Sequence, residues 1–180
     1  MKTNRILRAL VAVSGLVLLG CGIVYAPGDA LAGQPRLVTK FGNWDTYIVF
    51  EGTGNDKACY MASRSKVEDI GDKKRGGVYA VITHRPADNT LDVFSYIAGY
   101  TYKVGAEVSV DVDGQKFALF TEGDTAWTPG ADTDSKLAKA IRGGKVMTVT
   151  GTSARGTKTV DTLDLSGSSA AYEAITKECR

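Results

Sequence analysis

Histidine chemistry is limited in this chain, because the sequence contains a single histidine. That residue, His84, lies in the segment Thr83-His84-Arg85-Pro86, where a predicted strand ends and a turn begins. A Ser-His-Asp or Cys-His group needs an imidazole beside an activated nucleophile, and no Gly-x-Ser-x-Gly elbow is present to supply one. We therefore expect His84 to be an exposed or hydrogen-bonded structural residue, and we expect the protein not to be an enzyme.

Carboxylates offer the remaining catalytic alternative, a hydrolase that would use Glu122, Asp124 and Asp161. The sequence does not place these three side chains relative to one another, so this function is the least favoured of those considered. A structural zinc site is disfavoured as well, since one histidine and two distant cysteines do not make the usual four ligands. We expect no metal and no cofactor.

A glycine-containing segment, residues 151–158, resembles a phosphate-binding loop but lacks its key residue. Thr157 stands where that motif requires lysine, and strand patterns lie on both sides of the segment where a helix should follow. We interpret the segment as a connection between two strands. Arg155 is then either solvated or paired with a carboxylate.

Asp111 and Glu122, which lies eleven positions later, have the spacing of a calcium-binding EF-hand loop. Lys116 stands where that loop needs glycine, which argues against calcium. The alternation of apolar residues in the same segment predicts two strands joined by a type I′ turn at Asp113-Gly114.

Three tyrosines form the densest aromatic group of the sequence: Tyr96, Tyr100 and Tyr102. Aromatic residues at alternating strand positions are mostly core. Because this group continues past Gly99 into a predicted strand end, one or two of them, together with Arg155, could offer a contact surface for a protein or a glycan. The alternative is a periplasmic ligand binder or chaperone-like protein, in which the tryptophans and tyrosines line a pocket.

Short runs of period two, separated by Gly, Asp and Asn, predict a mainly β protein with an antiparallel β-sandwich. Two segments have helical spacing and predict two short helices, at residues 134–142 and, C-terminally, at residues 168–178. The strands are expected near residues 37–41, 44–51, 57–63, 77–84, 91–98, 107–112, 115–121, 145–153 and 157–165. The charged loop from Ser65 to Gly76 is expected to be solvated.

The N-terminal 32 residues have the pattern of a secretory signal peptide, with three basic residues, an apolar run and a small-x-small ending at Ala32. Cleavage there predicts a single domain over residues 33–180 with 19 acidic and 19 basic side chains. A neutral mature chain gives no reason to expect a nucleic-acid partner. Two alternatives remain for the leader, an uncleaved membrane anchor and a lipoprotein with its lipid on Cys21. The expected location is periplasmic or secreted, with the outer membrane as the lipoprotein alternative.

Cysteine arithmetic supports the cleavage, because removing the leader leaves Cys59 and Cys179 out of three cysteines. Two cysteines in an oxidising compartment predict a disulfide, and free thiols are the alternative. Cys179 continues the apolar stripe of the predicted C-terminal helix, which would turn it toward the sheet.

The order of several short segments resembles a known family. These segments are Phe41-Gly42-Asn43-Trp44, Cys59-Tyr60, Thr83-His84-Arg85-Pro86, Ile97-Ala98-Gly99-Tyr100, Thr121 to Trp127 and Gly151 to Thr157. Together they are similar to the invasion associated locus B family of bacterial envelope proteins, over nearly all of residues 37–179. The family pattern has Asp where Asn43 stands, a change that keeps the turn chemistry.

The resemblance implies an exported β-sandwich with appended helices and no known enzyme activity. It leads us to expect a non-catalytic envelope protein that interacts with another protein, at the cell envelope or in attachment to and invasion of host cells. The partner, an envelope or host protein, is not identified by any motif.

Overall fold

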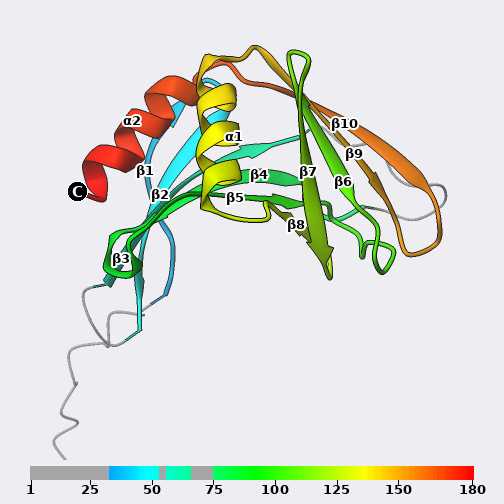
Figure 1. Cartoon of the computed structure of the whole chain (residues 1–180). Coiled ribbons are helices and arrows are strands. Elements are labelled where there is room, and N and C mark those ends of the chain that lie inside the picture. The colour runs from blue at the N-terminus through cyan, green and yellow to red at the C-terminus, as the bar shows by residue number, and fades with distance from the viewer. Residues whose placement is uncertain (1–32, 53–55, 66–74) are drawn as a thin grey trace, which may run out of the picture. The chain divides into compact units, whose positions relative to one another are not determined.

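The computed structural model describes residues 33–52, 56–65 and 75–180 (Figure 1). The predictions for the leader, which include cleavage after Ala32 and a lipid on Cys21, lie outside these residues, as does most of the charged loop. Within the described ranges, no helix has both the length and the apolar character needed to cross a bilayer.

The described residues form ten strands, and nine of them coincide with predicted segments to within two residues at each end. The bounds are β1 (Arg36–Phe41), β2 (Trp44–Glu51), β3 (Asp56–Arg64), β4 (Tyr79–Arg85), β5 (Thr90–Ile97), β6 (Val108–Val112), β7 (Gln115–Glu122), β8 (Thr125–Trp127), β9 (Val146–Thr152) and β10 (Lys158–Asp164). Strand β8 was not predicted from the sequence, because its three residues are too short to show a period. A 3₁₀ turn (Pro86–Asp88) joins β4 to β5.

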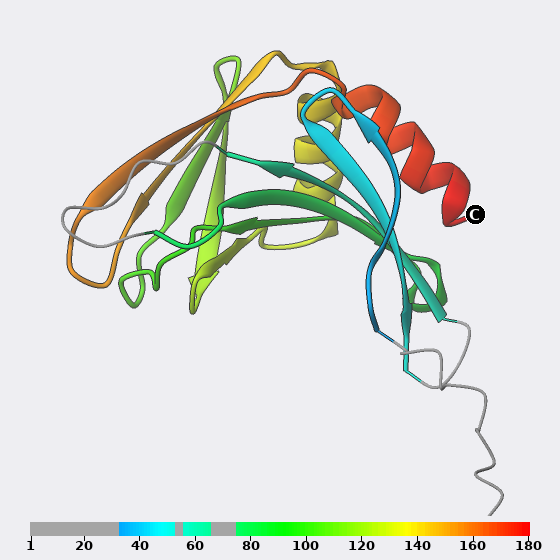
Figure 2. The ribbon, with the colours of Figure 1, turned by 180° about the vertical axis from the view of Figure 1, so that it is seen from behind.

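All ten strands belong to one antiparallel sheet, in the order β1-β2-β3-β4-β5-β8-β7-β6-β9-β10. Five intervals of about 4.8 Å would put β5 and β10 roughly 24 Å apart in a flat sheet. The Tyr96 hydroxyl of β5 nevertheless lies 2.6 Å from Asp161 Oδ2 of β10. The sheet therefore bends back on itself, as Figures 1 and 2 show, and its inward side chains form the core between the two halves.

The predicted β6–β7 hairpin is confirmed in detail. Val112 pairs with Gln115, and the two residues between them have positive φ angles, +49° at Asp113 and +94° at Gly114. Two consecutive positive φ angles define a type I′ turn, which Asp-Gly accommodates with little strain. The Asp113 carboxylate accepts bonds from the backbone N–H groups of Lys145 and Val146, so the turn also fixes the start of β9.

Two helices pack on the same side of β2–β5. Helix α1 (Ala131–Gly143) buries Leu137 and Ile141, and α2 (Ser168–Glu178) buries Ala171 and Ile175. Both helices were predicted from this spacing, and α1 begins three residues earlier than expected. The mainly β fold class with two short helices, the second C-terminal, is confirmed.

The predicted disulfide is present and joins Cys59 of β3 to Cys179 at the end of α2, with 5.8 Å between the Cα atoms. Cys59 is fully buried and Cys179 is nearly so. The apolar stripe of α2 therefore faces the sheet, as its period indicated. A disulfide of this kind fits an oxidising compartment.

Candidate functional site

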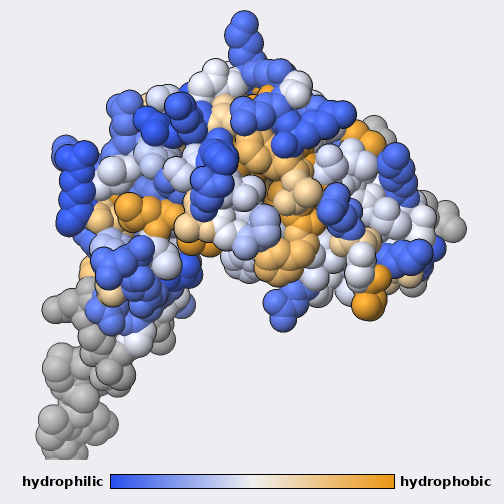
Figure 3. Space-filling view, viewed as in Figure 1, coloured by the Kyte–Doolittle hydropathy of each residue, from blue (hydrophilic) through white to orange (hydrophobic). Residues whose placement is uncertain are grey.

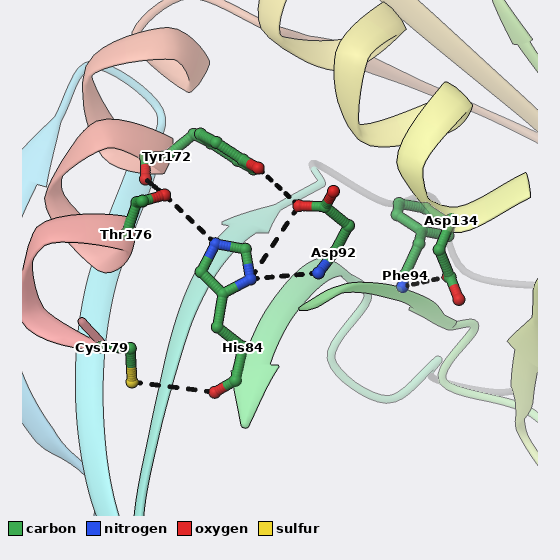
Figure 4. A network of polar contacts seen from close by, with 7 residues as sticks. All are labelled: His84, Asp92, Phe94, Asp134, Tyr172, Thr176 and Cys179. Atoms are coloured by element: carbon green, nitrogen blue, oxygen red, sulfur yellow. Dashed lines mark hydrogen bonds and ion pairs between the residues drawn. The ribbon is translucent and has the colours of Figure 1, made fainter. Parts of the chain in front are cut away.

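His84 lies under α2 and is 2% exposed, so it is a buried, hydrogen-bonded histidine (Figure 4). Its Nδ1 accepts a hydrogen bond from the Asp92 backbone N–H at 3.0 Å. The ring proton is therefore on Nε2, which donates to Thr176 Oγ1 at 3.3 Å. The Thr176 hydroxyl in turn donates to the Tyr172 carbonyl oxygen. The two ring nitrogens thus join β4 to α2 and to the start of β5.

Burial lowers the pKa of His84 below its ordinary value, and the nearby Asp92 carboxylate opposes this shift only in part. The carboxylate oxygen is 3.9 Å from Nδ1, which is too long for a hydrogen bond. Because Nδ1 accepts the Asp92 N–H and so carries no proton, the imidazole is neutral in this structure. A general base needs a free ring nitrogen within reach of substrate, and His84 offers none in this arrangement.

Asp92 and Tyr172 extend the network toward the surface. Asp92 has a φ of +63°, a conformation that costs free energy for a residue other than glycine. Its carboxylate accepts a 2.6 Å bond from the Tyr172 hydroxyl. Partial burial, followed by this bond, raises the pKa of Tyr172 to about 12. Neither residue was predicted from the sequence, because neither belongs to a motif and only the packing of α2 brings them together.

Asp134 connects α1 to the sheet in the same region (Figure 4). Its Oδ1 accepts a 2.7 Å bond from the Phe94 backbone N–H of β5 and a second bond from the Thr128 hydroxyl. Burial raises the pKa of Asp134, although these two bonds oppose the shift. The carboxylate is thus a structural anchor for the first turn of α1.

A buried ion pair joins Arg75 to Asp161 across the bend of the sheet. The guanidinium makes two 2.6 Å bonds to the two carboxylate oxygens, and its Nε donates to the Ala98 carbonyl. Asp161 Oδ2 also accepts the Tyr96 hydroxyl. The expectation of a solvated loop is wrong for Arg75, whose side chain is 2% exposed. The inward position of Asp161 in an alternating strand was the available signal that it needs a buried partner.

Two of the three tyrosines are core residues, since Tyr96 is 1% exposed and Tyr102 is 3% exposed, which leaves Tyr100 as the member of the group that reaches the surface. Gly99, with φ +69°, turns the chain back toward the sheet, and Tyr102 forms an isolated bridge with Ser153. The group therefore packs inside the bent sheet. Tyr100 is half-buried, under the Arg75 guanidinium.

The other candidate side chains lie at exposed turns. Glu122 and Asp124 are exposed at the β7–β8 turn, whereas Asp161 is buried and its carboxylate binds Arg75 and Tyr96, so the three carboxylates do not share one accessible site. Arg155 is exposed at the tip of the β9–β10 hairpin, where the segment that resembled a phosphate-binding loop joins two strands. No cluster of three or more metal-ligating side chains occurs among the residues that the structure describes.

The two tryptophans lie on opposite faces of the sheet and do not line one pocket. Trp44 is fully buried beneath the helices, whereas Trp127 of β8 pairs with Ser95 and Phe120 and points outward. Helices α1 and α2 contact the face that carries Cys59, His84 and Phe94. The opposite face, here called the outer sheet face, presents one partly or fully exposed apolar or aromatic side chain from each of six neighbouring strands: Tyr47, Tyr60, Val81, Val93, Trp127 and Phe120.

Two ion pairs border the outer sheet face. Lys40 Nζ lies 2.9 Å from Asp45 Oδ2, and Arg85 Nε lies 3.1 Å from Glu51 Oε2. Tyr47 and Tyr60 stack across β2 and β3, with ring centroids 5.0 Å apart. The centre of the face is thus apolar and aromatic, and the charges at its border neutralise each other within the chain.

Comparison with known proteins identifies relatives of this fold. The chain is similar to the crystal structure of invasion associated protein B from Bartonella henselae, with a TM-score of 0.57 and 19% sequence identity, over 79% of this chain and 98% of that chain. A search of curated proteins gives no match. The family model described as invasion associated locus B (IalB) protein matches residues 45–176. This match covers most of the chain and includes β3 to β10, α1, most of β2 and α2, and the His84 network. The protein therefore belongs to the invasion associated locus B family.

Proposed function

We propose that this protein is an exported, non-catalytic component of the bacterial envelope that binds another protein through its outer sheet face. The observation that carries the proposal is the row of outward apolar and aromatic side chains across six strands, on the side of the sheet opposite the helices. Aromatic residues are enriched at the centres of protein interfaces. The export signal predicted from the sequence and the disulfide support the location.

The chemistry of the border indicates what kind of partner fits. The charged residues at the border are already paired, Lys40 with Asp45 and Arg85 with Glu51, so a partner does not need to supply opposite charges there. A charged partner surface would have to lose its hydration without compensation. The partner is therefore a protein with an apolar, uncharged patch. In a host-associated organism, this partner would act in attachment or invasion.

Substitution on the outer sheet face tests the proposal. A strain that lacks the gene would be complemented with wild type, with Val81→Lys at the centre of the face, or with Val160→Lys. Val160 is the matched control, since it is an exposed valine on β10, outside the face. Protein level in the envelope fraction, detergent sensitivity and host-cell entry are the readouts.

We expect the Val81→Lys protein to reach the envelope at the wild-type level but not to complement the deletion. Partner binding would bury its ammonium group in an apolar interface and would therefore be weakened. Val160→Lys should restore wild-type behaviour. Full complementation by Val81→Lys, or a deletion strain without any phenotype in these assays, would show that the outer sheet face has no such role.

A further inference from the structure

A second surface feature lies on the helix side of the sheet, away from the outer sheet face. Helices α1 and α2 and the start of β5 border a solvent-open depression of about 470 Å³. Its polar lining residues are Asp92, Ser135, Lys139, Arg142, Ser169 and Tyr172. Figure 3 shows hydrophilic side chains over these helices and an apolar area beside α1, over β7 and β8. The side chains that line the depression are therefore mainly polar.

Arg142 is held in this depression by a series of contacts that begins in the core. Its guanidinium carbon lies 4.1 Å from the centroid of the Tyr172 ring. The Tyr172 hydroxyl is bonded to Asp92, and the Asp92 backbone is bonded to buried His84 (Figure 4). The guanidinium carbon lies over the ring, and no hydrogen bond or ion pair of the Arg142 side chain occurs among the described residues, so its N–H donors remain for a ligand. Preorganisation of this kind lowers the entropy cost of binding.

The charges of the depression leave one positive charge in excess. Lys139 and Arg142 contribute two positive charges, and neither has an ion-pair partner among the described residues. Asp92 contributes one negative charge and already accepts the Tyr172 hydroxyl. A ligand group with a single negative charge balances this set. The exposed hydroxyls of Ser135 and Ser169 add neutral donors.

We propose that this depression binds a carboxylate group of a ligand, with Arg142 as the bidentate donor and Lys139 as the second cation. A carboxylate is planar and singly charged, so its two oxygens match the edge of a guanidinium. Tyr172 and Asp92 are positioning residues, which orient Arg142 without meeting the ligand's oxygens. The site is separate from the outer sheet face and does not depend on the function proposed for it.

This site is tested by nuclear magnetic resonance titration of the ¹⁵N-labelled mature protein, with its disulfide intact. The probes are propionate, its uncharged analogue propionamide, and dimethyl phosphate, at constant ionic strength. We expect propionate alone to shift the amide signals of residues 139–143, 169–172 and 92. Arg142→Gln should weaken propionate binding about tenfold, and Lys139→Gln by less, as loss of a charge-assisted bond predicts.

Lys136→Gln is the matched control, because it removes one positive charge from the same helix but from a side chain that is paired with Asp132. It should leave propionate binding unchanged. Tyr172→Phe keeps the ring and removes the bond to Asp92, and should weaken binding a few-fold while the melting temperature shows that the protein is folded. Equal effects of the Arg142 and Lys136 substitutions, shifts scattered over all basic residues, or tighter binding of dimethyl phosphate would overturn the carboxylate site.

Discussion

Single polar side chains in the interior of this protein serve as links between elements. In the sequence, His84 and Asp161 are candidates for chemistry, and Asp134 is a further polar residue that the structure buries. Each of the three is hydrogen-bonded to neighbours from other elements. Buried polar groups must be satisfied in this way, because an unpaired one costs about 1–3 kcal/mol. These residues therefore determine how the helices and the bent sheet fit together.

The Arg75–Asp161 pair gives a prediction at this scale. Asp161→Asn leaves the guanidinium without its countercharge in the interior, and we expect a loss of about 3–5 kcal/mol in the free energy of unfolding, measured with urea. Replacing both partners, as Arg75→Met with Asp161→Leu, should recover part of that loss, because it removes the unpaired charge but leaves the Tyr96 hydroxyl and the Ala98 carbonyl without these partners. Glu122→Gln, at an exposed turn, should change stability by less than about 0.5 kcal/mol. A cost below about 1 kcal/mol for Asp161→Asn would contradict the role of the pair.

His84 predicts how stability depends on pH. The folded protein keeps the imidazole neutral, whereas the unfolded chain takes up a proton as the pH falls below the ordinary pKa of 6.5. Proton uptake on unfolding means that stability present at neutral pH is lost as the pH falls below that value. We expect His84→Gln to show a flatter dependence between about pH 7.5 and pH 5 in the same urea assay. Parallel curves for the two proteins would count against this account.

At the scale of elements, glycine residues let the β1–β2 turn and the segment before α2 lie in contact with each other. The Asn43 N–H in the β1–β2 turn donates to the Ser166 carbonyl before α2, at 3.2 Å. Gly42 and Gly167 have φ angles of +56° and +91°. A Cβ atom on Gly42 would lie 2.6 Å from the Ser166 oxygen, and one on Gly167 would collide with the Phe41 carbonyl. The contact thus requires glycine for space as well as for conformation.

A comparison of Gly167→Ala with Gly156→Ala separates the requirement for space from the requirement for a positive φ angle. Gly156 has a similar φ of +85°, but a Cβ atom added there would have no neighbour within 4 Å, so alanine meets only backbone strain. We expect about 1–2 kcal/mol of destabilisation for Gly156→Ala. Gly167→Ala should cost at least about 1 kcal/mol more, because backbone atoms must move. Equal unfolding free energies for the two variants would show that the backbone at Phe41 moves to accommodate the Cβ atom without loss of stability.

At the scale of the whole molecule, one disulfide bond closes a loop that contains all elements from the middle of β3 to the end of α2. The disulfide joins positions 120 residues apart and ties α2 to the third strand of the sheet. In the chain-entropy model, a closed loop of this length restricts the unfolded state strongly. The bond therefore reinforces a core that the bent sheet and two helices already provide.

Reduction of the disulfide should lower the free energy of unfolding by about 4–5 kcal/mol. The measurement is a pair of urea unfolding curves, with and without dithiothreitol. The variant Cys59→Ala with Cys179→Ala is the control and should give the same curve under both conditions. An unchanged midpoint after complete reduction of the wild type would mean that the native contacts alone hold α2 in place.

Elements with a local or periodic cause were predictable from the order of the residues. Alternation predicted nine strands, the Asp113-Gly114 pair predicted the type I′ turn, and the stripe of α2 predicted that Cys179 faces the sheet, because these features depend on neighbouring residues alone. The bend of the sheet was not predictable in this way, because it depends on contacts between distant strands. That bend buried Tyr96, Tyr102 and Arg75, and the packing of α2 assembled the His84 network, since contacts across 80 or more positions leave no local pattern.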